Sequence, residues 1–415
     1  MIRKLLSYKV PQNLLVLINA LALLLLITYN KNLDKNIIIS GVLLIFTIYI
    51  SSFILYKFSS GDHYIFLITT MLVSIGIIMV YRINPALGFK QIIWFGVGII
   101  IFYLSYFVVK YIKGWKKWTI LYLVLSLVLF LSTLILGVKV KGATNWIKIG
   151  GLGFQPSEII KILFIFFLAS YYTNKEKIKN KMFFLGIVYT FIAFLFIQKD
   201  LGTALLFYMI FITIFYVYED NRKLILYNLL GASVLGILSY LTLNHVRVRV
   251  ETWINPWKYI DGKGYQITQS LFAIASGGFF GTGLGLGHPE FIPEVHTDFI
   301  FSAICEEMGI FAGISIIMLF LIIVYRGIKI TLQQQDMFFR IIALGITSMF
   351  GFQAFIILGG VIKMIPLTGI TLPFVSYGGS SLVSSFIALG ILQVASEELD
   401  VEQEEDDEYR VQKDN

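Results

Sequence analysis

Charged side chains are scarce in this sequence: they make up 14% of the 415 residues, whereas apolar side chains make up 57%. A water-soluble domain carries about a quarter of charged residues, so a large soluble catalytic domain is excluded, and so is a disordered chain. The single cysteine, Cys305, cannot form an intrachain bridge, which excludes a disulfide scaffold. A chain of this composition is expected to fold in a lipid bilayer.

Long apolar runs are what the sequence has instead. Each run approaches the roughly 20 residues that cross a bilayer as a helix, so we predict an all-α polytopic membrane protein with about twelve transmembrane helices. The runs lie near residues 13–29, 36–56, 64–81, 91–109, 119–137, 158–172, 182–197, 201–218, 224–242, 298–325, 340–362 and 378–396.

The basic residues predict the orientation of these helices. The net charge is +8, but no basic stretch is interleaved with stacking aromatic residues, so nucleic acid is not an expected partner. With the N-terminus inside, the cytoplasmic segments before the tail carry 17 Lys and Arg residues and the short outer loops carry nine, which places both termini in the cytoplasm. The first run lacks a small-residue cleavage site and is expected to be retained as an anchor. Residues 397–415 are acidic and are predicted to form a disordered cytoplasmic tail.

Polar residues gather in two outer loops, 138–157 and the large loop 243–297 before the tenth run. The first loop contains Trp146 and leads to Glu158 at a helix start, followed by Lys161 inside an apolar run. A buried lysine there needs a partner: either Glu158, three residues back on the same helix face, or an acid from another helix. Asp200 is a second acid of this kind, although its position also suits a helix N-cap.

The large loop brings arginines and aromatic residues together. Arg247 and Arg249 precede Trp253 and Trp257, a combination that can clamp phosphate at headgroup depth. The glycines at 277–287 would let the backbone approach an anionic ligand, and plain loop flexibility accounts for them equally well. They lack the flanking strand and helix of a nucleotide-binding loop, so a P-loop or dinucleotide site is a poor interpretation.

The loop closes on Asp298, which is expected either to cap the next helix or to take part in catalysis. Polar residues then recur at spacings of three and four, which places them on one helix face toward protein or water. An ionisable side chain at membrane depth, such as Glu306, is a functional candidate by default. The stripe consists of Asp298, Ser302, Cys305, Glu306 and Gly309.

Six ordered motifs make the sequence resemble the SEDS family (shape, elongation, division and sporulation), whose members include FtsW, RodA and SpoVE. The resemblance spans about residues 64–396 and implies a peptidoglycan glycosyltransferase that polymerises lipid II at the outer face of the bacterial cytoplasmic membrane. It also implies a class B penicillin-binding protein as partner. The motifs are GATNWIKIGGLGFQPSEIIKI, QKDLGTALLF, INPW, GYQITQSLFAIASGG, IPEVHTDFIFSAICEEMG and LTGITLPFVSYGGSSL.

The resemblance also implies roles for single residues. Asp298 matches the essential outer carboxylate of the family, Trp146 a tryptophan of the first functional outer loop, and Lys161 with Asp200 a pair inside the bundle. Two departures stand out: Lys199 replaces the usual proline, and residues 1–60 add two helices before the ten-helix core at 61–396.

The chemistry of the implied reaction agrees with these residues. A carboxylate can act as general base on the attacking sugar hydroxyl, cations must neutralise the leaving pyrophosphate, and direct displacement inverts the sugar carbon without a covalent enzyme intermediate. We therefore expect Asp298 as the base, with a substrate-binding set of Trp146, Lys161, Arg247, Arg249 and Glu306. Mg²⁺ or Mn²⁺ suits the pyrophosphate, although no ligand spacing identifies a metal site, and no organic cofactor is expected.

Expected partners are lipid II, the nascent glycan strand, the penicillin-binding protein and membrane lipids. The alternatives are a flippase for the lipid-linked precursor, for which the sequence shows no internal repeat, and a non-catalytic scaffold. The sequence leaves open whether the protein serves elongation, division or sporulation.

Overall fold

The computed structural model describes residues 11–22, 35–140, 143–150, 152–174 and 180–397. Every predicted apolar run coincides with a helix, so the polytopic helical fold is confirmed; of the first run, the part beyond residue 22 lies outside the described residues. Eight of the described helices are long and apolar enough to cross a membrane.

The helices follow one another along the chain with these bounds. A helix at Pro11–Ala22 is followed by α2 (Lys35–Phe58), α3 (His63–Ile83), α4 (Pro85–Tyr111), η1 (Trp115–Lys117), α5 (Thr119–Leu136), α6 (Ser157–Thr173), α7 (Lys181–Ile197), α8 (Leu201–Tyr218), α9 (Arg222–Thr242), α10 (Asn244–Ile254), η2 (Pro256–Tyr259), α11 (Tyr265–Gly277), η3 (Pro289–Phe291), α12 (Ile300–Gln333), α13 (Met337–Val361) and α14 (Gly379–Ala395).

Asp and Asn side chains begin several of these helices. Asn84 accepts hydrogen bonds from two backbone N–H groups of α4, and Pro85 occupies the first helical position. Asp62, Asn180 and Asp336 cap α3, α7 and α13 in the same way. Each cap satisfies N–H groups that have no partner within the helix, so the local sequence sets where the apolar segments start.

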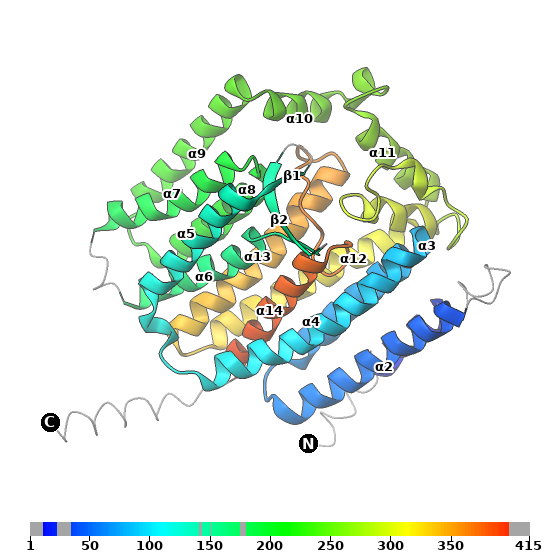
Figure 1. Cartoon of the computed structure of the whole chain (residues 1–415), viewed down its shortest axis with the longest axis horizontal. Coiled ribbons are helices and arrows are strands. Elements are labelled where there is room, and N and C mark those ends of the chain that lie inside the picture. Colours follow the sequence, from blue (N-terminus) through cyan, green and yellow to red (C-terminus); the bar gives the residue numbers. More distant parts are fainter. Residues whose placement is uncertain (1–10, 23–34, 141–142, 151, 175–179, 398–415) are drawn as a thin grey trace.

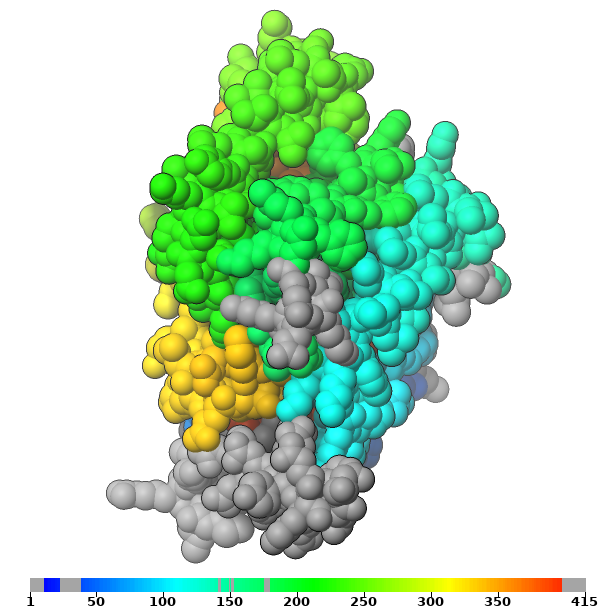
Figure 2. Space-filling view, turned by 90° about the vertical axis from the view of Figure 1, so that its left-hand side faces the viewer, coloured from blue at the N-terminus to red at the C-terminus, as the bar shows by residue number. Residues whose placement is uncertain are grey.

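The helices differ in how much of their surface other helices cover. α3 and α13 are buried along most of their length, whereas few residues of α5 and α9 are buried. Most of the exposed side chains of α9 are apolar, as at Leu230, Val234 and Leu238, which is the surface expected of a helix that faces lipid. Figure 2 shows a face of the molecule built largely by α7–α10, with the earlier helices beside them.

The first outer loop folds into a small antiparallel sheet of order β1-β2-β3, which the all-α expectation did not include. Its strands are β1 (Val138–Val140), β2 (Ala143–Ile149) and β3 (Leu152–Phe154). The Thr144 N–H donates to the Gln198 carbonyl oxygen at 3.1 Å, which ties the sheet to the turn between α7 and α8.

The large outer loop is mostly helical and lies across one end of the bundle, here called the cavity end (Figure 1). Two hydrogen bonds hold α10 against the loop that follows α13: the Trp253 indole donates to the Lys363 carbonyl at 3.1 Å, and Arg249 donates to the Thr368 carbonyl at 2.9 Å. The loop is therefore a structured layer rather than a linker.

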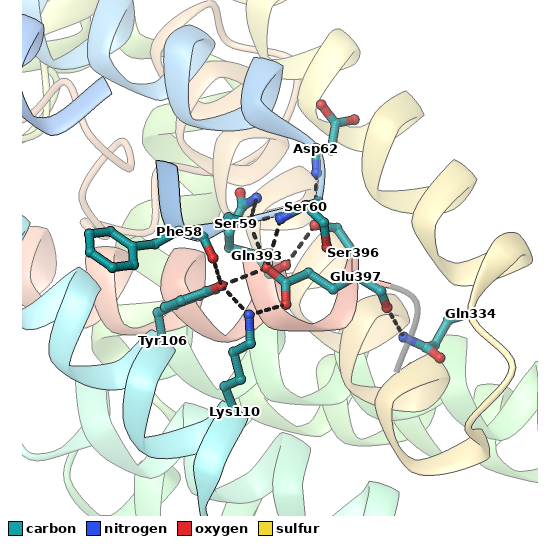
Figure 3. Close-up of polar contacts among 11 residues, drawn as sticks. Phe58, Ser59, Ser60, Asp62, Tyr106, Lys110, Gln334, Gln393, Ser396 and Glu397 are labelled. Carbon is teal, nitrogen blue, oxygen red and sulfur yellow. Dashed lines mark hydrogen bonds and ion pairs between the residues drawn. The ribbon is translucent and has the colours of Figure 1, made fainter. Parts of the chain in front are cut away.

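A buried polar cluster closes the opposite end, here called the tail end (Figure 3). The Glu397 carboxylate accepts hydrogen bonds from Ser59 and Tyr106, both at 2.6 Å, and forms an ion pair with Lys110 at 2.8 Å. These contacts join the α2–α3 connection, α4 and the end of α14. The rest of the predicted tail, residues 398–415, lies outside the described residues.

Candidate active site

A cavity of about 960 Å³ lies at the cavity end of the bundle. Its walls come from the β-sheet, from α4, α10 and α11, from the starts of α6, α8 and α14, from the segment before α12 and from the loop that follows α13. Four acidic and four basic side chains line it: Glu158, Asp200, Glu294, Asp298, Lys90, Lys199, Arg249 and Lys263. The tertiary structure thus brings both predicted outer loops to one polar pocket.

Asp298 lies in this cavity, in the turn before α12. The helix begins at Ile300 and its N-cap position is Phe299, which makes no side-chain cap bond, so the expectation that Asp298 caps this helix is wrong. The segment before Asp298 is fixed by the loop that follows α13. Ser376 donates its hydroxyl to the Thr297 carbonyl at 2.6 Å, and the Tyr377 N–H donates to the His296 carbonyl at 2.9 Å.

Arg249 is the cation next to Asp298. A Cβ built on Gly369 would lie 3.7 Å from Asp298 Oδ2 and 3.9 Å from Arg249 Nη2, so both side chains reach the same point of the cavity wall. Burial lowers the pKa of Arg249, while the carboxylates of Asp200 and Asp298 act in the opposite direction. The guanidinium remains charged, and both carboxylates attract it electrostatically.

Asp200 is held by the β-sheet and not by Lys161. Its Oδ2 accepts hydrogen bonds from the Asn145 amide at 2.8 Å and the Gln155 amide at 3.1 Å, and its Oδ1 accepts the Thr203 N–H at 3.2 Å. The predicted N-cap role of Asp200 is therefore confirmed, and its second carboxylate oxygen binds Asn145 on β2 and Gln155 just after β3.

Lys161 forms its ion pair with Glu158, at 2.7 Å. Its ammonium also donates to the Gln353 side chain at 3.1 Å, and Glu158 accepts a hydrogen bond from Ser384. The expected direct pair of Lys161 with Asp200 is thus not formed in this structure, because a carboxylate one helical turn away is closer. Lys161 is almost fully buried and is not among the side chains that line the cavity.

Two other predicted substrate-binding residues also lie away from the cavity lining. Arg247 is exposed and donates to the Leu241 carbonyl at 2.7 Å. Glu306 is buried and accepts the His288 N–H at 2.8 Å, so it holds the loop before α12. Trp146, by contrast, lies on β2 in the cavity wall, as a substrate-contacting residue requires.

Lys199 also lines the cavity, and its backbone adopts a φ of 61°. Proline fixes φ near −65°, so the turn before α8 takes a conformation here that a proline at this position could not adopt.

Several residues of the site were not singled out in the sequence. Asn145 and Gln155 hold Asp200, and Gly369 lies where Asp298 and Arg249 meet. All three fall within the quoted motifs, and Asn145 directly precedes Trp146. Membership in a motif therefore could have marked these residues as functional, but no spacing within the motifs indicates which partner each residue contacts.

Among the described residues, no three His, Cys, Asp or Glu side chains gather as a group that could hold a metal ion. The Arg249 guanidinium interacts electrostatically with both the Asp200 and the Asp298 carboxylates.

Comparison with known proteins agrees with this architecture. The chain is 36% identical over 360 residues to stage V sporulation protein E of Bacillus subtilis, covering 81% of this chain and 97% of the relative. It is 35% identical over 354 residues to a probable peptidoglycan glycosyltransferase FtsW of Geobacter metallireducens, covering 80% and 93%. It is 33% identical over 351 residues to the peptidoglycan glycosyltransferase RodA of Mycobacterium leprae, covering 78% and 75%.

Solved structures share the fold. A chain from a peptidoglycan synthase complex superposes with a TM-score of 0.70 at 24% identity, covering 81% of this chain and 98% of that one. RodA of Thermus thermophilus superposes with a TM-score of 0.63 at 23% identity, covering 82% and 98%. The model of the FtsW/RodA/SpoVE family, described as cell cycle protein, matches residues 62–400. The chain is a member of the FtsW/RodA/SpoVE family of multi-pass membrane proteins.

Proposed function

We propose that this protein is a peptidoglycan glycosyltransferase that polymerises lipid II into glycan strands. The observation that carries the proposal is the Asp298 carboxylate in a polar cavity at one end of a membrane bundle, beside the partly buried Arg249. Relatives that match most of the chain are named peptidoglycan glycosyltransferases.

In this proposal Asp298 is the general base. It accepts the proton of the acceptor sugar's 4-hydroxyl as that oxygen attacks C1 of the donor sugar. The bond between C1 and the pyrophosphate breaks, the pyrophosphate leaves with the electron pair, and C1 is inverted. A positioned base contributes about 10² to 10⁴-fold to the rate of such a step.

The cations of the cavity take the charge of the leaving group. Lys90, Lys199, Arg249 and Lys263 line the cavity, and preorganised cations stabilise charge that develops in the transition state. A divalent ion would add to this charge, but since the described residues form no cage for it, no step here depends on one.

The proposed setting is the bacterial cytoplasmic membrane, with both termini in the cytoplasm and the cavity at the outer face. The excess of basic residues in the predicted inner loops supports this orientation. The proposed partner is a class B penicillin-binding protein that crosslinks the glycan product. The similarity of the fold to a chain from a peptidoglycan synthase complex supports this pairing.

The test is polymer formation from purified lipid II by the reconstituted protein, with and without the penicillin-binding protein. Asp298→Asn keeps the shape of the side chain and removes its basicity, so we expect glycan synthesis to fall by at least about 10²-fold. Asp261→Asn, at an exposed carboxylate outside the cavity lining, is the matched control and should retain wild-type activity.

A flippase or a scaffold would give a different result. The proposed activity would be refuted if the wild-type protein makes no polymer under either condition. A flippase would instead move the lipid precursor across a vesicle membrane, and a scaffold would only recruit the transpeptidase. Near wild-type synthesis by Asp298→Asn would refute the role of Asp298 alone.

A further inference from the structure

α12 is interrupted at Gly309, whose φ of 82° and ψ of 171° are not helical. An interruption of this kind leaves backbone carbonyls before it and N–H groups after it without partners in the helix. In a bilayer each of these groups needs a partner within the protein, because no water is present to supply one.

The loop between α11 and α12 provides four such partners. The Thr282 and Gly283 N–H groups donate to the carbonyls of Glu306 and Glu307 at 2.9 and 3.0 Å. In return, the Ile310 and Phe311 N–H groups donate to the carbonyls of residues 278 and 279 at 3.0 and 3.4 Å. The loop thus inserts its own backbone into the helix at the kink.

Two glycines let the backbone of this segment come close to the backbone of α12. A Cβ on Gly281 would lie 2.2 Å from the Glu307 carbonyl oxygen, and one on Gly277 would lie 2.0 Å from the Cys305 carbonyl oxygen. Such distances exclude any other residue without a backbone shift. At these two positions glycine is therefore explained by packing of backbone against backbone, rather than by an anionic ligand or by flexibility.

The protein side of the loop is held by charge. Arg82, at the end of α3, forms an ion pair with Glu307 at 2.9 Å and donates to the carbonyls of Gly285 and Gly287 at 3.0 and 3.1 Å. Glu307 also accepts the Gly285 N–H at 2.9 Å. The loop is thus fixed to α3 and α12 and cannot swing freely.

The other side of the loop presents two exposed phenylalanines. Phe279 is 69% exposed and Phe280 is 84% exposed, and their ring centroids lie 5.8 and 5.6 Å from that of Phe311. Phe311 begins an exposed apolar stripe that continues down α12 through Ile314 and Met318. The two rings therefore extend the lipid-facing surface of a transmembrane helix.

The depth of this contact follows from the length of α12. Arg326, near the tail end, pairs with Asp62 in the α2–α3 connection, as charges do at a membrane boundary. Phe311 precedes Arg326 by 15 residues, which is about 22 Å of helix. Since the hydrocarbon core is about 30 Å thick, Phe311 and the rings against it lie inside the core.

We propose that residues 278–283 form a re-entrant loop that inserts Phe279 and Phe280 into the acyl chains of the leaflet on the cavity side. Four backbone groups of this loop are paired with α12, which lowers the usual cost of non-helical chain in hydrocarbon. The loop connects α11 to the segment before Asp298 (Figure 1), so the bilayer contributes to holding that segment. The inference does not depend on the proposed reaction.

The test measures where these side chains lie in a membrane. Phe279→Cys and Phe280→Cys are labelled with a nitroxide and reconstituted into vesicles of phosphatidylethanolamine and phosphatidylglycerol, without a partner protein. Collisions with oxygen, which concentrates in hydrocarbon, are compared with collisions with a water-soluble nickel chelate. We expect both labels to favour oxygen as strongly as a label at Phe311→Cys, and several-fold more than a label at the exposed Lys258→Cys.

The wild-type protein, whose Cys305 is buried, sets the background labelling. The proposal would be overturned if the labels at positions 279 and 280 collide with the nickel chelate as often as the Lys258 label does, while the Phe311 label stays in hydrocarbon. In that case the two rings would form a surface for a protein partner in the aqueous phase.

Discussion

At the scale of single residues, two arginines of one short helix have different surroundings. Arg247 and Arg249 are two positions apart on α10, and two positions on a helix differ by about 200° in direction. Only one of them can face the cavity. Arg249 does, and it donates to the Thr368 carbonyl, whereas Arg247 is exposed.

This difference predicts different outcomes for the same substitution. Arg249→Lys loses the planar fork that can bind two groups at once, so we expect lipid II polymerisation to fall at least about tenfold, equivalent to about 1.4 kcal/mol. Arg247→Lys should change the rate by less than about 1 kcal/mol of transition-state free energy, as is usual for an exposed charge. Initial rates of polymerisation across a lipid II titration compare the two variants. Equal losses in the two variants would show that the cavity does not distinguish the arginines.

A second prediction concerns the buried pair of Lys161 and Glu158. Removing one partner leaves an uncompensated buried charge, so Lys161→Met and Glu158→Gln should each destabilise the fold by about 3 to 5 kcal/mol. The double variant should be milder than the sum of the two. Thermal unfolding in detergent measures all three.

The matched cycle combines Lys161→Met with Asp200→Asn. These residues have other partners in the structure, so their effects should add. Strong coupling of Lys161 to Asp200, and none to Glu158, would contradict the ion pair described here.

At the scale of elements, the kink in α12 depends on glycine. A residue with a Cβ at position 309 would have to keep a positive φ, and its Cβ would lie 2.2 Å from the carbonyl oxygen of Phe279. The α11–α12 loop and the helix are therefore one unit, because each supplies hydrogen bonds that the other needs.

We predict that Gly309→Ala destabilises the protein by at least about 1 to 3 kcal/mol through backbone strain alone, and that it also weakens attachment of the loop. Gly96→Ala is the control, since a Cβ there on α4 meets nothing within 4 Å and alanine favours the helix. Melting temperature and protease sensitivity of the loop are the measurements. A Gly309→Ala protein as stable as Gly96→Ala would mean that the kink can relax into regular helix.

At the scale of the whole molecule, the tail-end cluster couples segments that are far apart in sequence. Glu397 contacts Ser59 across 338 positions and Tyr106 across 291. The α2–α3 connection, at which the match to the family begins, is thereby fastened to the end of α14 (Figure 3).

Breaking this cluster should loosen the tail end. Lys110→Met leaves the buried Glu397 carboxylate without its cation, and we expect a loss of about 1 to 3 kcal/mol, since Lys110 itself is partly exposed. Lys113→Met, an exposed position just beyond α4, should change stability by less than about 0.5 kcal/mol. Thermal unfolding of both variants in one detergent provides the comparison. Equal melting temperatures would show that the ion pair contributes nothing to the fold.

Much of the fold was readable from the sequence because the bilayer sets a length. A helix that crosses hydrocarbon needs about 20 apolar residues, so runs and their breaks mark helices directly. The same reasoning missed the β-sheet at 138–154 and the helices α10 and α11, because outside the membrane no such length rule applies.

The sequence by itself determined which residues are chemically unusual: a buried Lys161, an acid at Asp298, a tryptophan and arginines in outer loops. Tertiary structure alone decided which of them meet. It brought Trp146, Asp200, Arg249 and Asp298 to one cavity, paired Lys161 with Glu158, and turned Glu306 toward the loop before α12. The physical reason is range: hydrophobic periodicity acts within one helix, whereas a hydrogen bond or ion pair between distant segments depends on how whole helices and loops pack.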